Sequence, residues 1–540
     1  MSKNILKNKR SCVFILLFVL GTSVWLGGCD TAYKYDITDG IDNNGASEPD
    51  ITIDTEGGID VSMYEKARIF PGLVDTAKEE RINATIELDL NKQYIDSITL
   101  GVSKVPQPIY STGLYAGAGE QVAITVEDNT MGLSVIVGSH MDDLTELAPY
   151  QRMPLVYVAK ALFPGKNIIK NPLGGPIWIK KSLGLKASGT CSLKIEGVYK
   201  SPDFVIGETD LQDWKRRISE TTVPWLEIRG KHFAFTVQKD RVLDNLESIS
   251  STLQEVGKEW DEAIEEFFFE YYGLKIDKDA EEKERAPEFP FRVVLDVQVL
   301  GNLYLRNSDY AIVAINNTYM LEEMLNLRTL RIGNSVALLS AINSMCTYRS
   351  RNNPWPADYR AVANAIPLYR IGKKNFSKEN AFGEIFPGEE NITTLFPKAI
   401  EYAMADSSKW AKEDAATKYD DKTAYKAFDL LSLIQLANYD DNNWEAMKYL
   451  NLKAKEERSI DNSTLSYAFR MLCDYFKQNL CPFFDYWGVE QLDEDRKYAE
   501  QYPLMDKKIW EYNPLNPQQL KDYDVSSYCY RHSRRDWKDR

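Results

Sequence analysis

Histidine is scarce in this sequence. Its 540 residues include three, His140, His232 and His532. Two histidines that hold one metal ion from a helix stand four residues apart, because that spacing puts both imidazoles on one face. No two of these three are that close, so the sequence offers no helical metal pair. We interpret each of the three as a structural or surface histidine.

The sequence also lacks motifs for nucleophilic catalysis and for phosphate binding. The sequence contains no G-x-S-x-G elbow, no glycine-rich phosphate loop and no C-x-x-C pair. Beyond the first thirty residues the cysteines are odd in number and widely spaced, at Cys191, Cys346, Cys473, Cys481 and Cys529. Cys473 and Cys481 are near enough to pair, but the pattern favours buried free thiols.

Carboxylates are the abundant reactive groups, with 80 Asp and Glu against 65 Lys and Arg. The net charge of −15 argues against nucleic acid as a partner, since phosphate binding needs clustered basic residues. A glycosidase needs only two carboxylates at a suitable separation. Three candidates lie in distinctive motifs, Glu227, Asp296 and Asp485. Capping and structural hydrogen bonds are the simpler interpretation of all three.

The N-terminal segment 1–28 has the features of a secretory leader. A lysine- and arginine-rich start precedes the apolar run 12–20, which is too short to span a membrane. Leu26-Gly-Gly-Cys29 resembles a bacterial lipobox, which implies cleavage before Cys29 and lipid attachment to its thiol. The alternative is a plain signal peptide with a chance cysteine. We therefore expect a lipid-anchored protein of the bacterial cell envelope, at the outer membrane, on its periplasmic or its surface face.

The expected secondary structure, which must position any site, differs from one part of the chain to the next. Residues 29–60 are acidic and rich in Gly and Asn, which indicates a solvated tether. Residues 61–205 alternate apolar and polar residues with a period of two, as in 84–90, 121–126, 133–137 and 191–195. This pattern predicts a β-sandwich-like domain. A buried strand is expected over 291–300.

Helical periodicity dominates from about residue 240. Apolar residues recur every three or four positions from Val242 to Tyr271, with Gly273 as the expected C-cap, which predicts one long amphipathic helix. Further helices are expected around 319–328, 333–346, 357–370, 395–405, 423–438 and 463–478. The fold class is therefore α+β and multidomain. The extension 496–540 ends in a basic tail, which we expect to be solvated or to contact anionic glycans or lipid headgroups.

Seven segments occur in an order typical of one peptidase family. They are STGLYAGAGE (111–120), NPLGGPIWI (171–179), PDFVIGETDLQDW (202–214), VPWLEI (223–228), RVVLDVQ (292–298), LIQL (433–436) and NLCPFFDYWG (479–488). Together they resemble the M60 (enhancin-like) metallopeptidases, particularly the lipoproteins of Bacteroidetes. The resemblance implies a zincin-like domain with a helix-rich C-terminal half over 206–495.

The resemblance also implies zinc, held by a helix of the form H-E-x-G-H and a downstream glutamate. The zinc would polarise the scissile carbonyl and activate a water, with the motif glutamate as general base. This sequence departs from the pattern. Leu338 and Ile342 stand at the two histidine positions and Leu339 at the glutamate position, with Arg360 near the third ligand position. Residues 310–370 contain no histidine, so we expect no zinc and no other cofactor.

The turn where the family places another histidine reads Gly301-Asn-Leu-Tyr-Leu-Arg-Asn-Ser-Asp-Tyr310. We take five residues as candidates for a ligand-binding cleft: Tyr304, Arg306, Asp309, Tyr310 and Trp355. The alternative for this segment is a surface turn. The favoured function is a catalytically inactive M60-like lipoprotein that binds glycoprotein or glycopeptide of mucin type. The alternatives are an active hydrolase, using zinc or carboxylates, and a structural or assembly lipoprotein.

Overall fold

The computed structural model describes residues 70–528, apart from 128–129, 148, 186–187, 301–302, 332–334, 350–351, 376–395, 398, 402–421, 440–443, 458, 462, 488, 490 and 515–519. The expected leader, Cys29, the tether, Cys529, His532 and the basic tail all lie outside the described residues.

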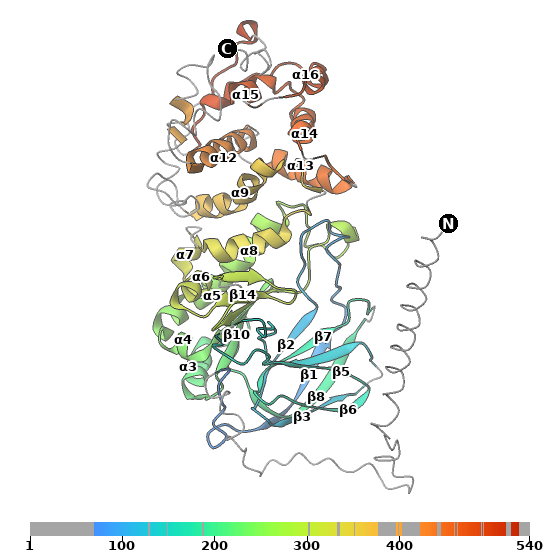
Figure 1. Cartoon of the computed structure of the whole chain (residues 1–540), viewed down its shortest axis with the longest axis vertical. Helices are drawn as coiled ribbons and strands as arrows, with labels where there is room; N and C mark the ends of the chain where they lie inside the picture. The colour runs from blue at the N-terminus through green and yellow to red at the C-terminus, as the bar shows by residue number, and fades with distance from the viewer. Residues whose placement is uncertain are drawn as a thin grey trace, which may run out of the picture. The chain divides into compact units, whose positions relative to one another are not determined.

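The N-terminal part is an antiparallel β structure of two layers (Figure 1). One layer holds β5 (Val158–Leu162), β4 (Leu133–Val137), β7 (Gly175–Lys181) and β2 (Ile109–Ala116). The other holds β1 (Ile82–Asp89), β8 (Thr190–Lys200), β3 (Gln121–Val126) and β6 (Gly165–Lys170). The end of β8 also pairs with β2, which joins the layers.

Alternation along the strands builds the core between these layers. Val122 and Ile124 of β3 face a common cluster with Val135 of β4 and Ile179 of β7, all at most 1% exposed. The predicted strands 121–126 and 133–137 coincide with β3 and β4. The expectation of a β-rich N-terminal region is thus confirmed.

A second, six-stranded mixed sheet follows. Its order is β13 (Leu305–Asn307), β14 (Ile312–Ile315), β12 (Phe291–Asp296), β11 (Phe233–Gln238), β10 (Trp225–Arg229) and β9 (Phe204–Val205). All six residues of β12 are buried, as the apolar run predicted. Because β9 already pairs with β10, the chain changes sheets after Lys200, slightly before the expected boundary at 205.

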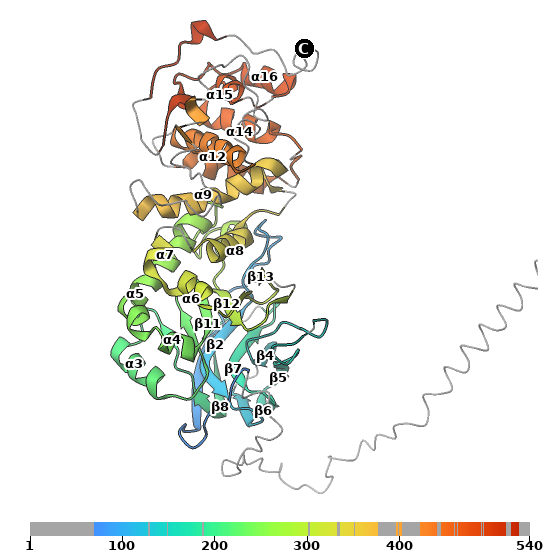
Figure 2. The same ribbon diagram turned by 60° about the vertical axis from the view of Figure 1, so that its left-hand side comes forward.

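Three helices and a π-helical turn cover this sheet: α3 (Leu211–Glu220), α4 (Lys239–Leu243), α5 (Leu246–Glu262) and the segment Ala263–Phe269 (Figure 2). The expected single helix from 242 to 271 is therefore interrupted, between α4 and α5 and again by the π turn. Gly273 has a φ of +66°, which fits its predicted place at the helix end.

The remainder of the chain is helical. Its helices are α6 (Thr318–Leu325), α7 (Leu327–Arg331), α8 (Val336–Cys346), α9 (Ala357–Asn375), α12 (Lys422–Asn438), α13 (Glu445–Glu456), α14 (Ser466–Phe476), α15 (Cys481–Tyr486) and α16 (Asp493–Ala499). The helix-rich C-terminal half is confirmed. Among the described residues, no helix has both the length and the apolar character needed to cross a bilayer.

The segment after residue 496 is partly integrated into the helical region. The Gln435 side chain on α12 donates to the carbonyls of Trp510 and Tyr512. Cys473 and Cys481 are buried free thiols, so the pairing left open by the sequence does not form. Cys191 and Cys346 are likewise free and buried, as expected.

Candidate functional site

Helix α8 is the element on which the sequence placed the degenerate metal site. Its N-terminus is held by Glu323 of α6, which is 1% exposed. The Glu323 carboxylate accepts hydrogen bonds from the backbone N–H groups of Ala337, at 3.3 Å, and Leu338, at 2.9 Å. The Ser335 hydroxyl donates to the Glu323 carbonyl at 2.8 Å. A carboxylate thus satisfies N–H groups at the positive end of the helix dipole.

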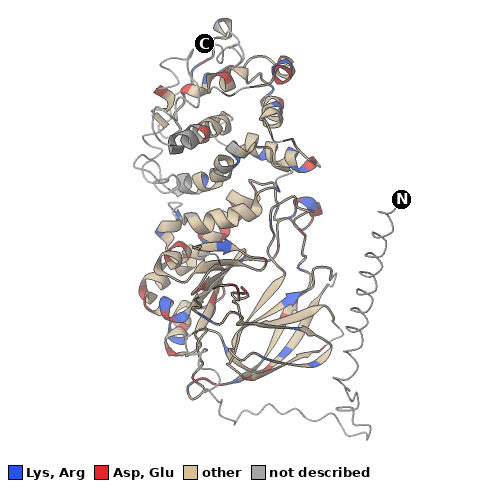
Figure 3. Ribbon diagram, viewed as in Figure 1, with Lys and Arg blue, Asp and Glu red and all other residues tan. Residues whose placement is uncertain are grey.

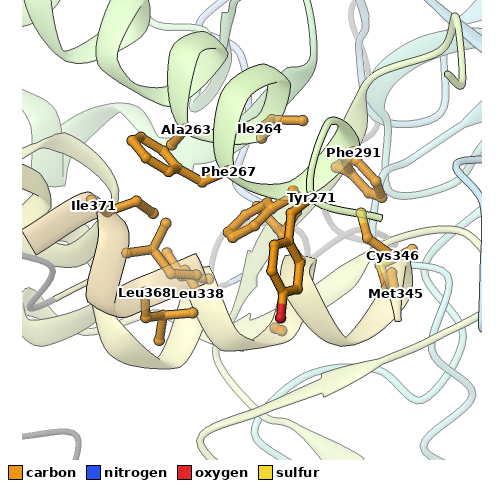
Figure 4. Packing of buried hydrophobic residues seen from close by; sticks show 14 of the residues in the cluster. Ala263, Ile264, Phe267, Tyr271, Phe291, Leu338, Met345, Cys346, Leu368 and Ile371 are labelled. Carbon is orange, nitrogen blue, oxygen red and sulfur yellow. The ribbon is translucent and has the colours of Figure 1, made fainter. Parts of the chain in front are cut away.

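The side chains at the positions that the resemblance assigns to the zinc-binding motif are enclosed. Leu338, Leu339 and Ile342 are each 0% exposed. Figure 4 shows Leu338 beside Leu368 and Ile371 of α9, with Phe267 of the π-helical turn facing them. Helix α8 carries no charged residue, and it is tan along its length in Figure 3. Buried apolar side chains therefore fill the space around positions 338, 339 and 342, and a metal site there would need an open cleft.

Arg360 occupies the first part of α9. Its backbone N–H donates to the carbonyl of Pro356 at 3.0 Å, and its side chain is half-buried. Its Nε is buried and has no hydrogen-bond partner among the described residues. A guanidinium at this position would repel a divalent metal ion.

Zinc does not fit this arrangement. Hydrocarbon side chains at 338, 339 and 342 have no lone pair to donate, and Zn²⁺ takes nitrogen, sulfur or oxygen ligands. Within the described part of the chain, no group of three or more His, Cys, Asp or Glu residues is placed to hold a metal ion. No chemical step through a metal follows from these residues.

The two described histidines are built into the core. His140 lies edge-to-face against Phe70 and Trp225, and its Nε2 donates to the Leu295 carbonyl at 2.9 Å. Burial lowers the pKa of His140 to about 4. His232 Nε2 lies 2.6 Å from a Glu265 carboxylate oxygen, and desolvation lowers the pKa of His232 as well. Both have structural partners, as the sequence indicated.

The five candidate cleft residues do not gather in one cleft. Tyr304 is 66% exposed, Arg306 is ion-paired with Asp142, and Trp355 is buried against Tyr359. Trp355 is therefore a core residue and not the cleft residue that we expected.

Asp309 and Tyr310 do share a pocket of about 280 Å³, whose wall also includes Tyr94 and Lys104. The Lys104 ammonium lies 3.5 Å from the exposed Asp309 carboxylate. The Tyr310 hydroxyl accepts a hydrogen bond from the Met141 N–H at 2.8 Å. Of the five candidates, the structure brings only these two together.

The three singled-out carboxylates are ion-paired. Glu227 accepts from Arg292 at 2.7 Å, Asp296 from Arg152 at 2.7 Å, and Asp485 from Arg496 at 3.0 Å. The Arg152–Asp296 pair is fully enclosed, at 0% exposure for both side chains. These contacts favour the structural interpretation over a catalytic pair. Sequence reasoning missed both arginine partners of Glu227 and Asp296, which lie 65 and 144 residues away and have no local signal.

Two family models match consecutive stretches of the chain. Residues 80–195 match the N-terminal domain of M60-like peptidases, and residues 197–331 match peptidase M60, enhancin and enhancin-like. The second match ends before α8 begins at Val336.

Several solved structures have a fold similar to that of this chain. The M60 catalytic domain of Clostridium perfringens ZmpC, solved with the sialyl T antigen, has a TM-score of 0.59 at 15% identity and covers 80% of this chain and 82% of its own. A mutant of a functionally unknown conserved protein of Bacillus anthracis has a TM-score of 0.61 at 19% identity, with coverage of 82% of this chain and 84% of its own. These likenesses show the fold.

Among curated proteins, human TRPM8 channel-associated factor 2 is 27% identical over 195 residues. That match covers 35% of this chain, and the chain spans about a fifth, 19%, of the factor's own length.

Proposed function

We propose that this chain, whose placement in the M60 family is supported by both family matches and by the shared fold, is a non-catalytic member that binds glycoprotein or glycopeptide. The observation that carries the proposal is the burial of Leu338, Leu339 and Ile342, which the resemblance aligns with the family's zinc-binding motif. A peptidase of this type needs a metal-bound water that reaches substrate, and an apolar core admits neither.

The ligand class follows from the scaffold. The ZmpC catalytic domain was solved with a glycan antigen, so this fold can present a glycan-binding surface. The present chain keeps exposed aromatic side chains such as Tyr304 and Tyr319, at 66% and 45% exposure. Exposed aromatic rings offer flat apolar faces against which sugar rings can pack. Mucin-type glycoprotein is therefore the proposed ligand.

We also propose that Cys29 carries a lipid, which would hold the protein at the bacterial envelope, on the periplasmic or surface face of the outer membrane. The support is the lipobox-like Leu26-Gly-Gly-Cys29 and the acidic segment that follows it. Growth with a clickable fatty-acid analogue should label the protein, and Cys29→Ala should abolish the label. Equal labelling of both would refute the anchor.

Catalytic inactivity is tested by metal analysis and a cleavage assay on the full mature chain. We expect no stoichiometric zinc by elemental mass spectrometry and no degradation of mucin or casein. An M60 peptidase with an intact H-E-x-G-H helix is the matched positive control. Stoichiometric zinc with chelator-sensitive cleavage would refute the proposal in favour of a zinc hydrolase. Cleavage insensitive to chelators would favour a carboxylate enzyme.

Ligand binding is tested by capture on immobilised mucin. We expect the chain to be retained on native mucin and released when the mucin is enzymatically deglycosylated first. Retention that does not depend on the glycans, or no retention, would favour the structural or assembly alternative.

A further inference from the structure

We propose that a groove between α5, α6 and α7 binds one neutral sugar residue of a glycan. The inference rests on the proposed glycoprotein binding and assigns it a place and a ligand class. The groove, called here the α5–α7 groove, has a volume of about 430 Å³. That volume lies in the range of small-molecule sites, and it is larger than the 280 Å³ pocket at Asp309.

Part of the polar lining of the α5–α7 groove makes no bonds within the described protein, whereas the side chains of Asn245, Ser251, Asn326 and Arg331 are bonded. Ser248 and Thr252 of α5 and Thr318 of α6 present hydroxyl groups to it. The Glu322 carboxylate and the Arg328 guanidinium also lie in its wall. Within the described residues, none of these five side-chain groups has a hydrogen bond or an ion pair, so each is available to a ligand.

The balance of these groups fits a neutral polyol. Hydroxyl groups both donate and accept, Glu322 accepts, and Arg328 donates. A second guanidinium in the wall, Arg331, is already paired with Glu255 at 3.3 Å and Glu259 at 3.1 Å. With one carboxylate, Glu322, and one guanidinium without a partner among the described residues, Arg328, the wall favours neither an acidic nor a basic ligand. A sugar ring, which carries donors and acceptors without net charge, matches this set.

Apolar surface completes the site. The groove wall includes Ile249, Leu321 and Leu325, which are buried. Tyr319, next to the groove residue Thr318 on α6, is 45% exposed. It packs edge-to-face with the exposed Tyr304, with ring centroids 6.2 Å apart. Figure 2 shows α5, α6 and α7 close together beside the sheet. The two tyrosines can extend contact to the next sugar of a chain.

The test uses the full mature chain and five free sugars: galactose, N-acetylgalactosamine, N-acetylglucosamine, mannose and fucose. Saturation-transfer NMR reports binding of each. We expect at least one sugar to bind, and the double variant Thr252→Val/Glu322→Ala to weaken it about tenfold, since a hydroxyl and a carboxylate that bond the sugar are removed. Thermal melts of the variant verify folding. Lys104→Met, in the pocket at Asp309, is the matched control and should leave binding unchanged.

Each other result overturns the inference. Unchanged sugar binding in the groove variant, or lost binding in Lys104→Met, would place the sugar elsewhere. Capture on native mucin without binding of any of the five sugars would refute the groove while the proposed function stands. Failure of both assays would refute the two proposals together.

Discussion

The core around α8 and the α5–α7 groove are built from neighbouring helices, yet one is closed and apolar and the other is open and polar. Helix α6 contributes to both through adjacent residues. Glu323 is 1% exposed and caps α8, whereas Glu322 is exposed and lies in the groove wall. Consecutive residues on a helix point about 100° apart, so a pair of glutamates can serve two different surroundings. The contrast separates the buried apolar positions 338, 339 and 342 from the open groove that we propose as the binding site.

The strongest test of this contrast is to introduce the family's histidine and glutamate side chains on α8. The triple variant Leu338→His/Leu339→Glu/Ile342→His should lose more than about 5 kcal/mol of unfolding free energy, because it buries three polar groups without partners. Urea denaturation followed by circular dichroism measures the loss.

Ser340→Glu is the matched control, since Ser340 is exposed on the same helix, and its effect should stay within about 0.5 kcal/mol. A triple variant that folds with full stability and takes up one zinc would show that the α8 region is an open site.

Part of the loss of stability in acid should arise at His140, where the sandwich meets the sheet. Positions 338, 339 and 342 hold no titratable side chain and should not contribute. The pKa of His140 is about 4 when folded and near 6.5 when unfolded, so the unfolded chain takes up its proton first as pH falls. Stability should therefore drop between pH 6.5 and 4, by up to about 3 kcal/mol. Denaturation curves across this range measure the slope, and His140→Gln should reduce it, leaving the part due to His232, whose pKa is also lowered by desolvation. A slope unaffected by His140→Gln would contradict the assignment.

The two glutamates of α6 allow a direct comparison. Glu323→Ala should cost about 1–3 kcal/mol, because two N–H groups at the start of α8 lose their acceptor in a buried place. Glu322→Ala should change stability by less than about 0.5 kcal/mol, since its carboxylate is solvated. Thermal or urea unfolding of the pair decides the point. Equal losses would mean that the groove wall is part of the core.

The smallest expected effect is that of Arg328→Gln. Stability should remain within about 0.5 kcal/mol of the parent chain, because the guanidinium has no partner among the described residues. Mucin retention should nevertheless fall severalfold, since a long, charged hydrogen-bond donor is replaced by a shorter neutral amide. A stability loss without any change in retention would assign Arg328 a structural role.

Periodic patterns made much of the fold predictable from the sequence. β3, β4 and β12 follow from alternating or continuous apolar residues, and α8 lies within the expected helix 333–346. α13, with its narrow apolar stripe of Met447, Leu450 and Ala454, was not predicted. The interruption between α4 and α5 was also missed, because a period near 3.6 continues through it.

The candidate site was less predictable. The sequence singled out Leu338, Leu339 and Ile342, but their complete enclosure depends on side chains from α9 and the π-helical turn. Trp355 was expected in a cleft and lies in the core, because its exposure depends on tertiary packing. The α5–α7 groove brings together residues some 70 positions apart on three helices, and no local sequence motif predicts that they lie close together.

Contacts between the N-terminal sandwich and the six-stranded sheet decide whether the protein can be divided into fragments. Arg152 of the sandwich neutralises Asp296 of the sheet, and Trp178 of the sandwich donates to Glu227 at 3.1 Å. A fragment cut at residue 196, between the two family matches, would leave Asp296 buried without its counter-ion and the sandwich with an unmatched arginine. Removing one partner of such a pair costs about 3–5 kcal/mol. The two matched regions therefore depend on each other for folding, and we expect neither to be stable when expressed alone.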